Sequence, residues 1–218
     1  MTSLEKKLRS CTGRICRIRH CIPDDLHNEI YRTLFESHLS YGISVWGNVS
    51  TNRLEPLFIT QKKCIRILFG NKYAYNDKFE TCARARPFSA QALNSEHFML
   101  EGTKPLFNRN EIFTVHNLYK YHIIISTYKL LRSRIPISLY SLYKFSNHVE
   151  TRLKSQYTAC KFIDNSTIIW NTFREKLHIY DFNVTISKLK TDAKKHILSL
   201  QRAHDENVWN ILNYEMLC

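Results

Sequence analysis

The chain has 218 residues, which is enough for one ordinary domain or two small ones. Hydrophobic residues make up 44% of it, so it can build a core, and this excludes a wholly disordered chain. Only 5 Gly and 5 Pro argue against a loop-rich sandwich, a collagen and a low-complexity polymer. The 32 Lys and Arg residues outnumber the 19 acidic residues by 13. Such an excess predicts a polyanionic partner, either nucleic acid or an anionic membrane.

The N-terminal residues are charged, and the apolar stretch of a secretory signal does not follow them. No segment reaches the roughly 18 apolar residues of a bilayer span. We therefore expect an intracellular protein, in the cytoplasm or the nucleus, that is not secreted. Cys11, Cys16 and Cys21 recur every five residues, a step that rotates them apart on a helix. Reduced thiols are thus favoured over a metal site.

The first 70 residues show the periodicity of helices. Apolar residues recur at steps of three and four over residues 3–19, with cations on the other faces. Pro23-Asp24-Asp25 combines a proline with carboxylates that suit a helix start. A kink or stop is expected between Gly42 and Gly47, and a third helix from near Asn52 to Phe69. These elements predict a small helical bundle over residues 1–70.

The rest of the chain divides into a connector and a second helical region. Residues 71–110 break the pattern and stay basic, which indicates a connector with one short helix near 90–99. Residues 111–218 are predicted to be helical again, interrupted by a polar, irregular stretch over 137–165. Helices are expected up to Ile135-Pro136, over 166–177 and over 187–213. The chain as a whole is predicted to be all-α.

No catalytic centre is recognisable in the sequence. Asp24-Asp25 superficially resembles the paired aspartates of a polymerase palm, but two-metal catalysis needs a third carboxylate on another strand. Glu5 is the sole acid before the pair, so the helix-start interpretation is favoured. The motifs of phosphate-binding loops, serine nucleophiles and zinc proteases are not found. We therefore expect no catalytic residue, no metal, no cofactor and no small-molecule substrate.

Phosphate contact is the chemistry that the sequence favours. Cations gather on the outer face of the third helix, in the connector, and opposite the apolar stripe of the last helix. The alternative is that these cations only solvate the surface, but the charge excess is large for that. The candidate nucleic-acid contacts are Lys62, Lys63, Arg66, Arg84, Arg86, Lys194 and Lys195.

Several motifs follow one another along the chain in a fixed order. They are Ser37-His38-Leu39-Ser40-Tyr41-Gly42 with Val45-Trp46-Gly47, Gln61-Lys62-Lys63 with Ile65-Arg66-Ile67, Lys78-Phe79-Glu80-Thr81-Cys82-Ala83-Arg84-Ala85-Arg86-Pro87, Thr103-Lys104-Pro105-Leu106-Phe107, and Trp170-Asn171 before a Lys-rich helix. This ordered set, across roughly residues 4–200, resembles the segment after the palm in non-LTR (LINE-type) retrotransposon reverse transcriptases.

The resemblance implies a thumb-like bundle followed by a C-terminal extension, which in that family grip template RNA and primer DNA. The polymerase aspartates and the endonuclease lie upstream in the family, so the resemblance transfers no catalytic residue. We therefore expect a non-catalytic fragment of an RNA-directed DNA polymerase. Its expected partners are RNA or an RNA–DNA hybrid and the missing palm domain, with no membrane.

Three alternatives stay open at this stage. The chain could be an inert structural remnant or a protein-interaction fragment with no independent activity. It could be an active polymerase, which primer extension would reveal. It could also bind an anionic membrane surface through a basic amphipathic helix over residues 187–204.

Overall fold

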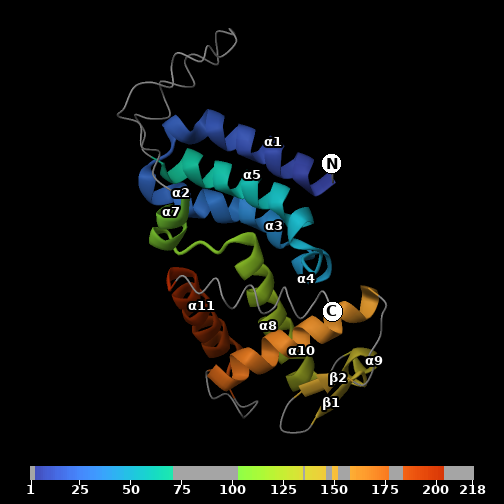
Figure 1. Cartoon of the computed structure of the whole chain (residues 1–218). Helices are drawn as coiled ribbons and strands as arrows, with labels where there is room; N and C mark the ends of the chain where they lie inside the picture. The colour runs from blue at the N-terminus through green and yellow to red at the C-terminus, as the bar shows by residue number, and fades with distance from the viewer. Residues whose placement is uncertain are drawn as a thin grey trace. The chain divides into compact units, whose positions relative to one another are not determined.

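The computed structural model describes residues 3–70, 103–134, 136–145, 149–151, 158–176 and 184–203. These residues are mostly helical, with one small two-stranded sheet, so the all-α prediction is confirmed. The chain forms two compact units, coloured along the chain in Figure 1. Unit 1 comprises residues 1–41 and 55–114, and unit 2 comprises residues 42–54 and 115–218. The short helix expected near 90–99 lies outside the described residues.

The unit boundaries follow tertiary contacts rather than chain order. Residues 42–54 belong to unit 2, although the sequence groups them with the first bundle. Helix α5 (Thr51–Phe69) passes from unit 2 into unit 1 between Leu54 and Glu55. The next residue, Pro56, has no N–H to donate to the carbonyl four residues earlier, so the helix lacks a hydrogen bond close to the boundary.

Unit 1 is a bundle of helices from two stretches of the chain. The first contains α1 (Ser3–Ile18), η1 (Arg19–Cys21), η2 (Asp24–Leu26), α2 (His27–Ile30), η3 (Tyr31–Glu36) and α3 (Ser37–Ser40), and the second contains most of α5 and α7 (Thr103–Arg109). The segment η3 is a π-helix. The helices expected over 3–19 and from Asn52 to Phe69 are thus confirmed.

A buried amide joins the helices of unit 1. The Gln61 side chain on α5 is fully buried, and its Nε2 donates to the Tyr31 hydroxyl and to the Phe113 carbonyl, each at 2.8 Å. The Cys11 thiol donates to the Leu34 carbonyl at 2.9 Å. Burial raises the pKa of the Cys64 thiol, which fits an inert thiol inside the core.

Unit 2 packs three longer helices against a short hairpin. Its elements are α4 (Ile43–Trp46), α8 (Val115–Ser133), α9 (Ile137–Tyr140), β1 (Tyr143–Phe145), β2 (Val149–Thr151), α10 (Thr158–Lys176) and α11 (Ile186–Arg202). The strands β1 and β2 are antiparallel, with Lys144 opposite Glu150. None of the described helices combines the length and the apolar character that crossing a bilayer requires.

The prediction of an irregular stretch over 137–165 is wrong. That stretch holds α9, the hairpin and the first residues of α10, which begins at Thr158 rather than near 166. The polar residues there look loop-like in sequence, but the hairpin within the stretch is held by two polar residues that follow it on α10. Ser166 hydrogen-bonds to the Tyr143 hydroxyl at 2.7 Å. Asn171 bonds to both the N–H and the carbonyl of Val149, at 3.1 and 2.8 Å, which ties the hairpin to α10.

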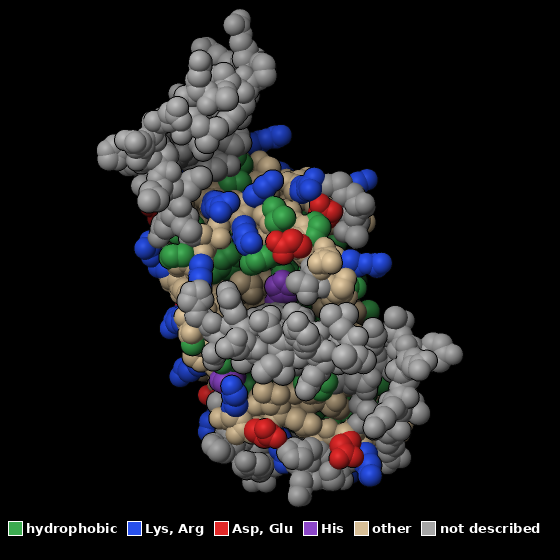
Figure 2. All heavy atoms as spheres, in the orientation of Figure 1, with side chains coloured by type: hydrophobic (Ala, Val, Ile, Leu, Met, Phe, Trp, Pro, Cys, Tyr) green, Lys and Arg blue, Asp and Glu red, His purple; other side chains and the backbone are tan. Residues whose placement is uncertain are grey.

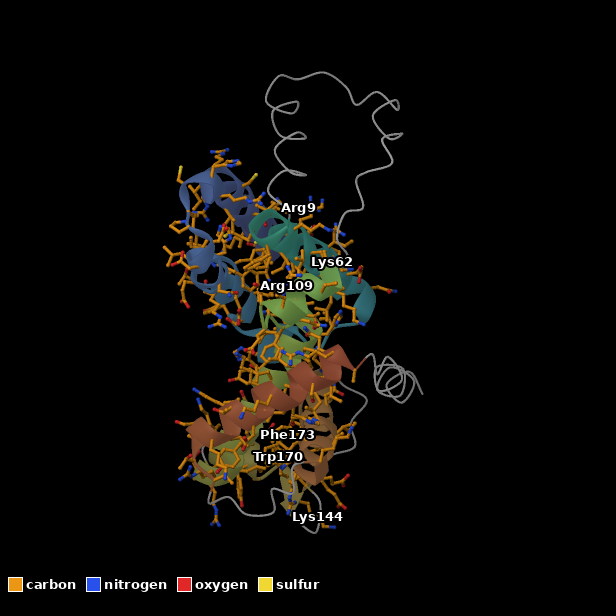
Figure 3. The ribbon with its side chains drawn as sticks, turned by 90° about the vertical axis from the view of Figure 1, so that its left-hand side faces the viewer. Arg9, Lys62, Arg109, Lys144, Trp170 and Phe173 are labelled. Carbon is orange, nitrogen blue, oxygen red and sulfur yellow. The ribbon has the colours of Figure 1, made fainter. Side chains whose placement is uncertain are left out.

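Aromatic rings fill the centre of unit 2 (Figure 3). Trp170 is fully buried, with its ring centroid 5.9 Å from that of Tyr128 and 6.2 Å from that of Phe173. Aromatic pairs at these separations stabilise the folded state by more than the burial of their apolar area alone.

The Tyr-Gly and Trp-Gly motif requires glycine at both of its positions, for a different structural reason at each. Gly42 precedes α4 with φ of 65°, a conformation that strains residues with a Cβ. At Gly47, an added Cβ would lie 2.5 Å from Cδ2 of the Tyr119 ring. The expected break between these glycines is present, as α4 and the turns on either side of it.

Candidate nucleic-acid interface

Helix α11 is anchored in unit 2 by one apolar face. Thr185 caps its N-terminus by accepting a hydrogen bond from the Lys188 N–H at 3.3 Å. Leu189, Ala193, Ile197 and Leu198 are buried, and they recur with the spacing of one helix face. The opposite face of the helix is therefore turned to solvent.

Hydrogen bonds to α8 hold both ends of α11. The Val184 carbonyl, just before the helix, accepts from the Tyr128 hydroxyl and from Arg132 Nη1. Near the other end, Asn117 Nδ2 donates to Gln201 Oε1 at 2.8 Å. Because the start of α11 meets the end of α8, the two helices run antiparallel. These bonds fix which face of α11 points outward.

The outward face carries cations alternating with small hydroxyl residues. We call this set the α11 stripe: Lys188, Thr191, Lys195, Ser199 and Arg202, all of them exposed. Its members follow one another at steps of three or four residues, so they line one side of the helix. The three cations are seven residues apart, or about 10 Å along the helix axis. The short hydroxyl side chains between them leave room for a phosphate to approach.

Other charges near the α11 stripe are also mostly positive. Lys190 is exposed and Lys194 is half-buried, while Asp192 is the single acidic residue of the helix. His196, whose ring meets the edge of Phe173, has its pKa lowered by burial and then by Lys176. His196 is therefore neutral at pH 7, and the positive field comes from Lys and Arg.

The last helix thus bears the expected cations, but the exposed stripe is wider than predicted. Lys195 belongs to the stripe, whereas Lys194 lies beside it and is half-buried. Lys188 and Arg202 were not among the candidate contacts. The seven-residue spacing of Lys188, Lys195 and Arg202 is the sequence signal that finds them, because residues seven apart share a helix face.

The cations predicted on α5 belong to unit 1 and are less available. Lys63 is exposed, while Lys62 and Arg66 are half-buried. Lys62 Nζ lies 3.9 Å from a Glu55 carboxylate oxygen and 3.9 Å above the ring of Phe58. Its charge is therefore partly engaged within unit 1, and Figure 3 labels Lys62 on α5. The remaining candidates, Arg84 and Arg86, lie outside the described residues.

No metal-binding cluster is formed by the part of the chain that the structure describes. Cys16 is buried on α1, whereas Cys21 is exposed. Asp24 and Asp25 lie in the first turn of a helical segment after Pro23, as the helix-start interpretation predicts. Asp24 Oδ1 lies 3.8 Å from His27 Nε2.

Comparisons of the chain with protein-family models, with curated proteins and with solved structures found no match. Among the described residues, the α11 stripe is the best-defined candidate site.

Proposed function

We propose that this chain binds the phosphate backbone of RNA or of an RNA–DNA hybrid through the α11 stripe. We further propose that it corresponds to the non-catalytic region after the palm of a LINE-type reverse transcriptase. The observation that carries the proposal is the row of Lys188, Lys195 and Arg202 on one exposed face of a helix whose other face is fixed in the core.

The electrostatics of this face suit a polyanion. A cation that contacts a phosphate displaces condensed counterions, so binding weakens as salt rises. Each contact adds about 0.9 to the slope of log affinity against log salt for a duplex, and about 0.7 for a single strand. Three contacts from the α11 stripe should therefore contribute a slope of about 2 to 3.

The sequence resemblance supports the assignment to this family. Its Tyr-Gly and Trp-Gly motif includes Gly42 and Gly47, both of which have a structural requirement for glycine. The motif Trp170-Asn171 supplies the central ring of unit 2 and the clamp on Val149. Motifs that carry such packing roles are expected to persist in a family, because each replacement would disturb the core.

The test is a fluorescence-anisotropy titration of a labelled RNA–DNA hybrid at two salt concentrations. We expect salt-dependent binding by the natural chain. The triple variant Lys188→Gln, Lys195→Gln and Arg202→Gln should bind at least tenfold more weakly at low salt, with a slope lower by about 2 to 3. A matched triple variant, Lys129→Gln, Arg134→Gln and Lys144→Gln, removes three exposed cations of unit 2 from other elements and should change binding much less.

Four results would each contradict part of the proposal. Binding that is lacking at low salt, or that ignores salt, would leave the inert remnant as the better interpretation. An equal loss of affinity in both triple variants would show that the cations of α11 contribute no more to binding than other cations of unit 2. Binding to vesicles with anionic lipids, but not to the hybrid, would favour a membrane partner instead. Magnesium-dependent primer extension on a homopolymer template would overturn the non-catalytic assignment.

A further inference from the structure

A second cationic face lies on α1, in the other unit. We call it the α1 face: its exposed residues include Lys6, Lys7, Ser10, Gly13, Arg14 and Arg17. The opposite side of the helix packs into unit 1, with Leu8, Cys11 and Ile15 almost fully buried. None of the sequence-based candidates included these cations, because they were assigned only to the polar side of an amphipathic helix.

The single acidic residue of α1 does not weaken this face. Glu5 is buried, and its carboxylate lies 2.7 Å from Arg9 Nη2. The four cations Lys6, Lys7, Arg14 and Arg17 make no ion pair within the described part of the chain. Their charges are therefore available to a partner. In Figure 2, Lys and Arg side chains are spread over the surface formed by α1 and α5.

The α1 face has the same spacing of cations and small residues as the α11 stripe. Lys7 and Arg14 are seven residues apart, as are neighbouring cations of the stripe, and Lys6 and Arg17 are three turns apart. Small residues again lie between the cations, and a Cβ built on Gly13 would meet no atom within 4 Å. Phosphates can therefore approach both helices closely, while neither helix contains a Phe, Tyr or Trp for base stacking.

We infer that each unit binds its own phosphate backbone, so that one chain bridges two separate nucleic-acid duplexes. This inference rests on the proposed function and extends it from binding to bridging. Since neither helix offers stacking rings and the cations are proposed to contact phosphates, bridging should be independent of sequence. Holding two segments on one chain raises the local concentration of each near the other.

The test is a capture assay with one duplex immobilised on beads and a second, fluorescent duplex in solution. The natural chain should recover the fluorescent duplex at intermediate protein concentration. Recovery should fall again when protein is in excess, because each duplex then carries its own chains. Light scattering at the same concentrations must show a monomer, which removes self-association as the cause of capture.

Variants of α1 separate bridging from binding. The variant Lys7→Gln with Arg14→Gln should still bind one duplex through α11 but should recover at least fivefold less of the second. A matched variant, Arg32→Gln with Lys104→Gln, removes two exposed cations of unit 1 from other helices and should keep its capture. The charge-conserving variant Lys7→Arg with Arg14→Lys should capture as the natural chain does, which assigns capture to the positive charge at these two positions, and hydrogen exchange in α1 of the Gln variant should match that of the natural chain.

The outcomes are distinct for the two proposals. If the natural chain binds no duplex at low salt, the proposed function itself fails. If it binds one duplex but never captures a second, or if Lys7→Gln with Arg14→Gln leaves capture unchanged, bridging alone is overturned.

Discussion

Helices α1 and α11 present similar outer faces but are held in place by different means. The buried side of α1 relies on apolar residues such as Leu8 and Ile15, with a thiol hydrogen bond from Cys11. Helix α11 adds polar ties to α8 at both ends, through Val184 and Gln201. Local periodicity is therefore sufficient to create a cationic helix face, whereas the contacts that hold the helix in place depend on the surrounding unit. Damage to one unit should therefore remove one face and spare the other.

The largest expected effect comes from removing a central core side chain in either unit. Trp170→Ala should destabilise unit 2 by about 3–5 kcal/mol, because it empties the site between Tyr128 and Phe173. Leu8→Ala should destabilise unit 1 by about 2–5 kcal/mol. Hydrogen exchange resolved by peptide should show faster exchange only in the unit that carries the change. If either variant opens both units together, the two faces are not independently anchored.

Adding one methyl group at a glycine of each unit should have opposite effects on the stability of the two units. Gly47→Ala should destabilise unit 2 by about 1–3 kcal/mol, because the new Cβ collides with the buried Tyr119 ring. Gly13→Ala on α1 should instead stabilise unit 1 by about 0.5–1 kcal/mol, because the position is helical and open. Denaturation midpoints of the two variants, measured against the natural chain, should move in opposite directions. A stabilising Gly47→Ala would show that the Tyr119 ring moves aside easily.

Removing the two hydrogen bonds between Asn171 on α10 and Val149 in the hairpin should have an intermediate effect on stability. Asn171→Ala leaves the Val149 N–H and carbonyl without their side-chain partners, and should cost about 1–2 kcal/mol. Asn171→Asp can still accept from the N–H but cannot donate to the carbonyl, so it should lose part of the stability. Hydrogen exchange at the Val149 amide checks this, and unchanged exchange in Asn171→Ala would contradict the clamp.

The smallest expected effect is a dependence of unit 2 on pH. Burial lowers the pKa of both His122 and His196, and both residues belong to unit 2. A histidine whose folded pKa lies below its unfolded value of about 6.5 is protonated first in the unfolded chain. The two histidines should therefore leave the stability of unit 2 unchanged above that pH and should lower it as the pH drops below that value.

Denaturant titrations at pH 7 and pH 5 measure this loss. His196→Gln should reduce the difference between the two titrations, because it removes one of the two groups. A variant that keeps the full difference would mean that His196 does not contribute.

Much of the fold follows from patterns that are local in the sequence. The stripe of Leu8, Cys11 and Ile15 predicts α1, and the spacing of apolar residues predicts α5 up to Phe69. These predictions succeed because residues three and four apart share a helix face, whatever the helix then packs against. The cations of the outer faces follow by the same rule, since the faces that are not buried must be solvated.

The parts that were missed depend on contacts between distant residues. The hairpin of Tyr143–Phe145 and Val149–Thr151 is too short to show a period, and it is held by Ser166 and Asn171 from a helix later in the chain. The early start of α10 was hidden because its buried polar residues have partners that no local pattern reveals. One local contact was also missed, because Glu55, seven residues before Lys62 on α5, lies near its ammonium group and lowers the value of a site residue that looked free in the sequence.

Local patterns establish the helical class, the amphipathic helices with their cationic outer faces and the excess of 13 positive charges. Periodicity and composition are properties of the chain, so they need no tertiary information. Tertiary packing places residues 42–54 in unit 2, puts α1 and α11 in different units and leaves Lys194 half-buried beside the exposed row. Burial and partnership are set by which distant segments pack together, and that packing turns a diffuse positive charge into two defined faces.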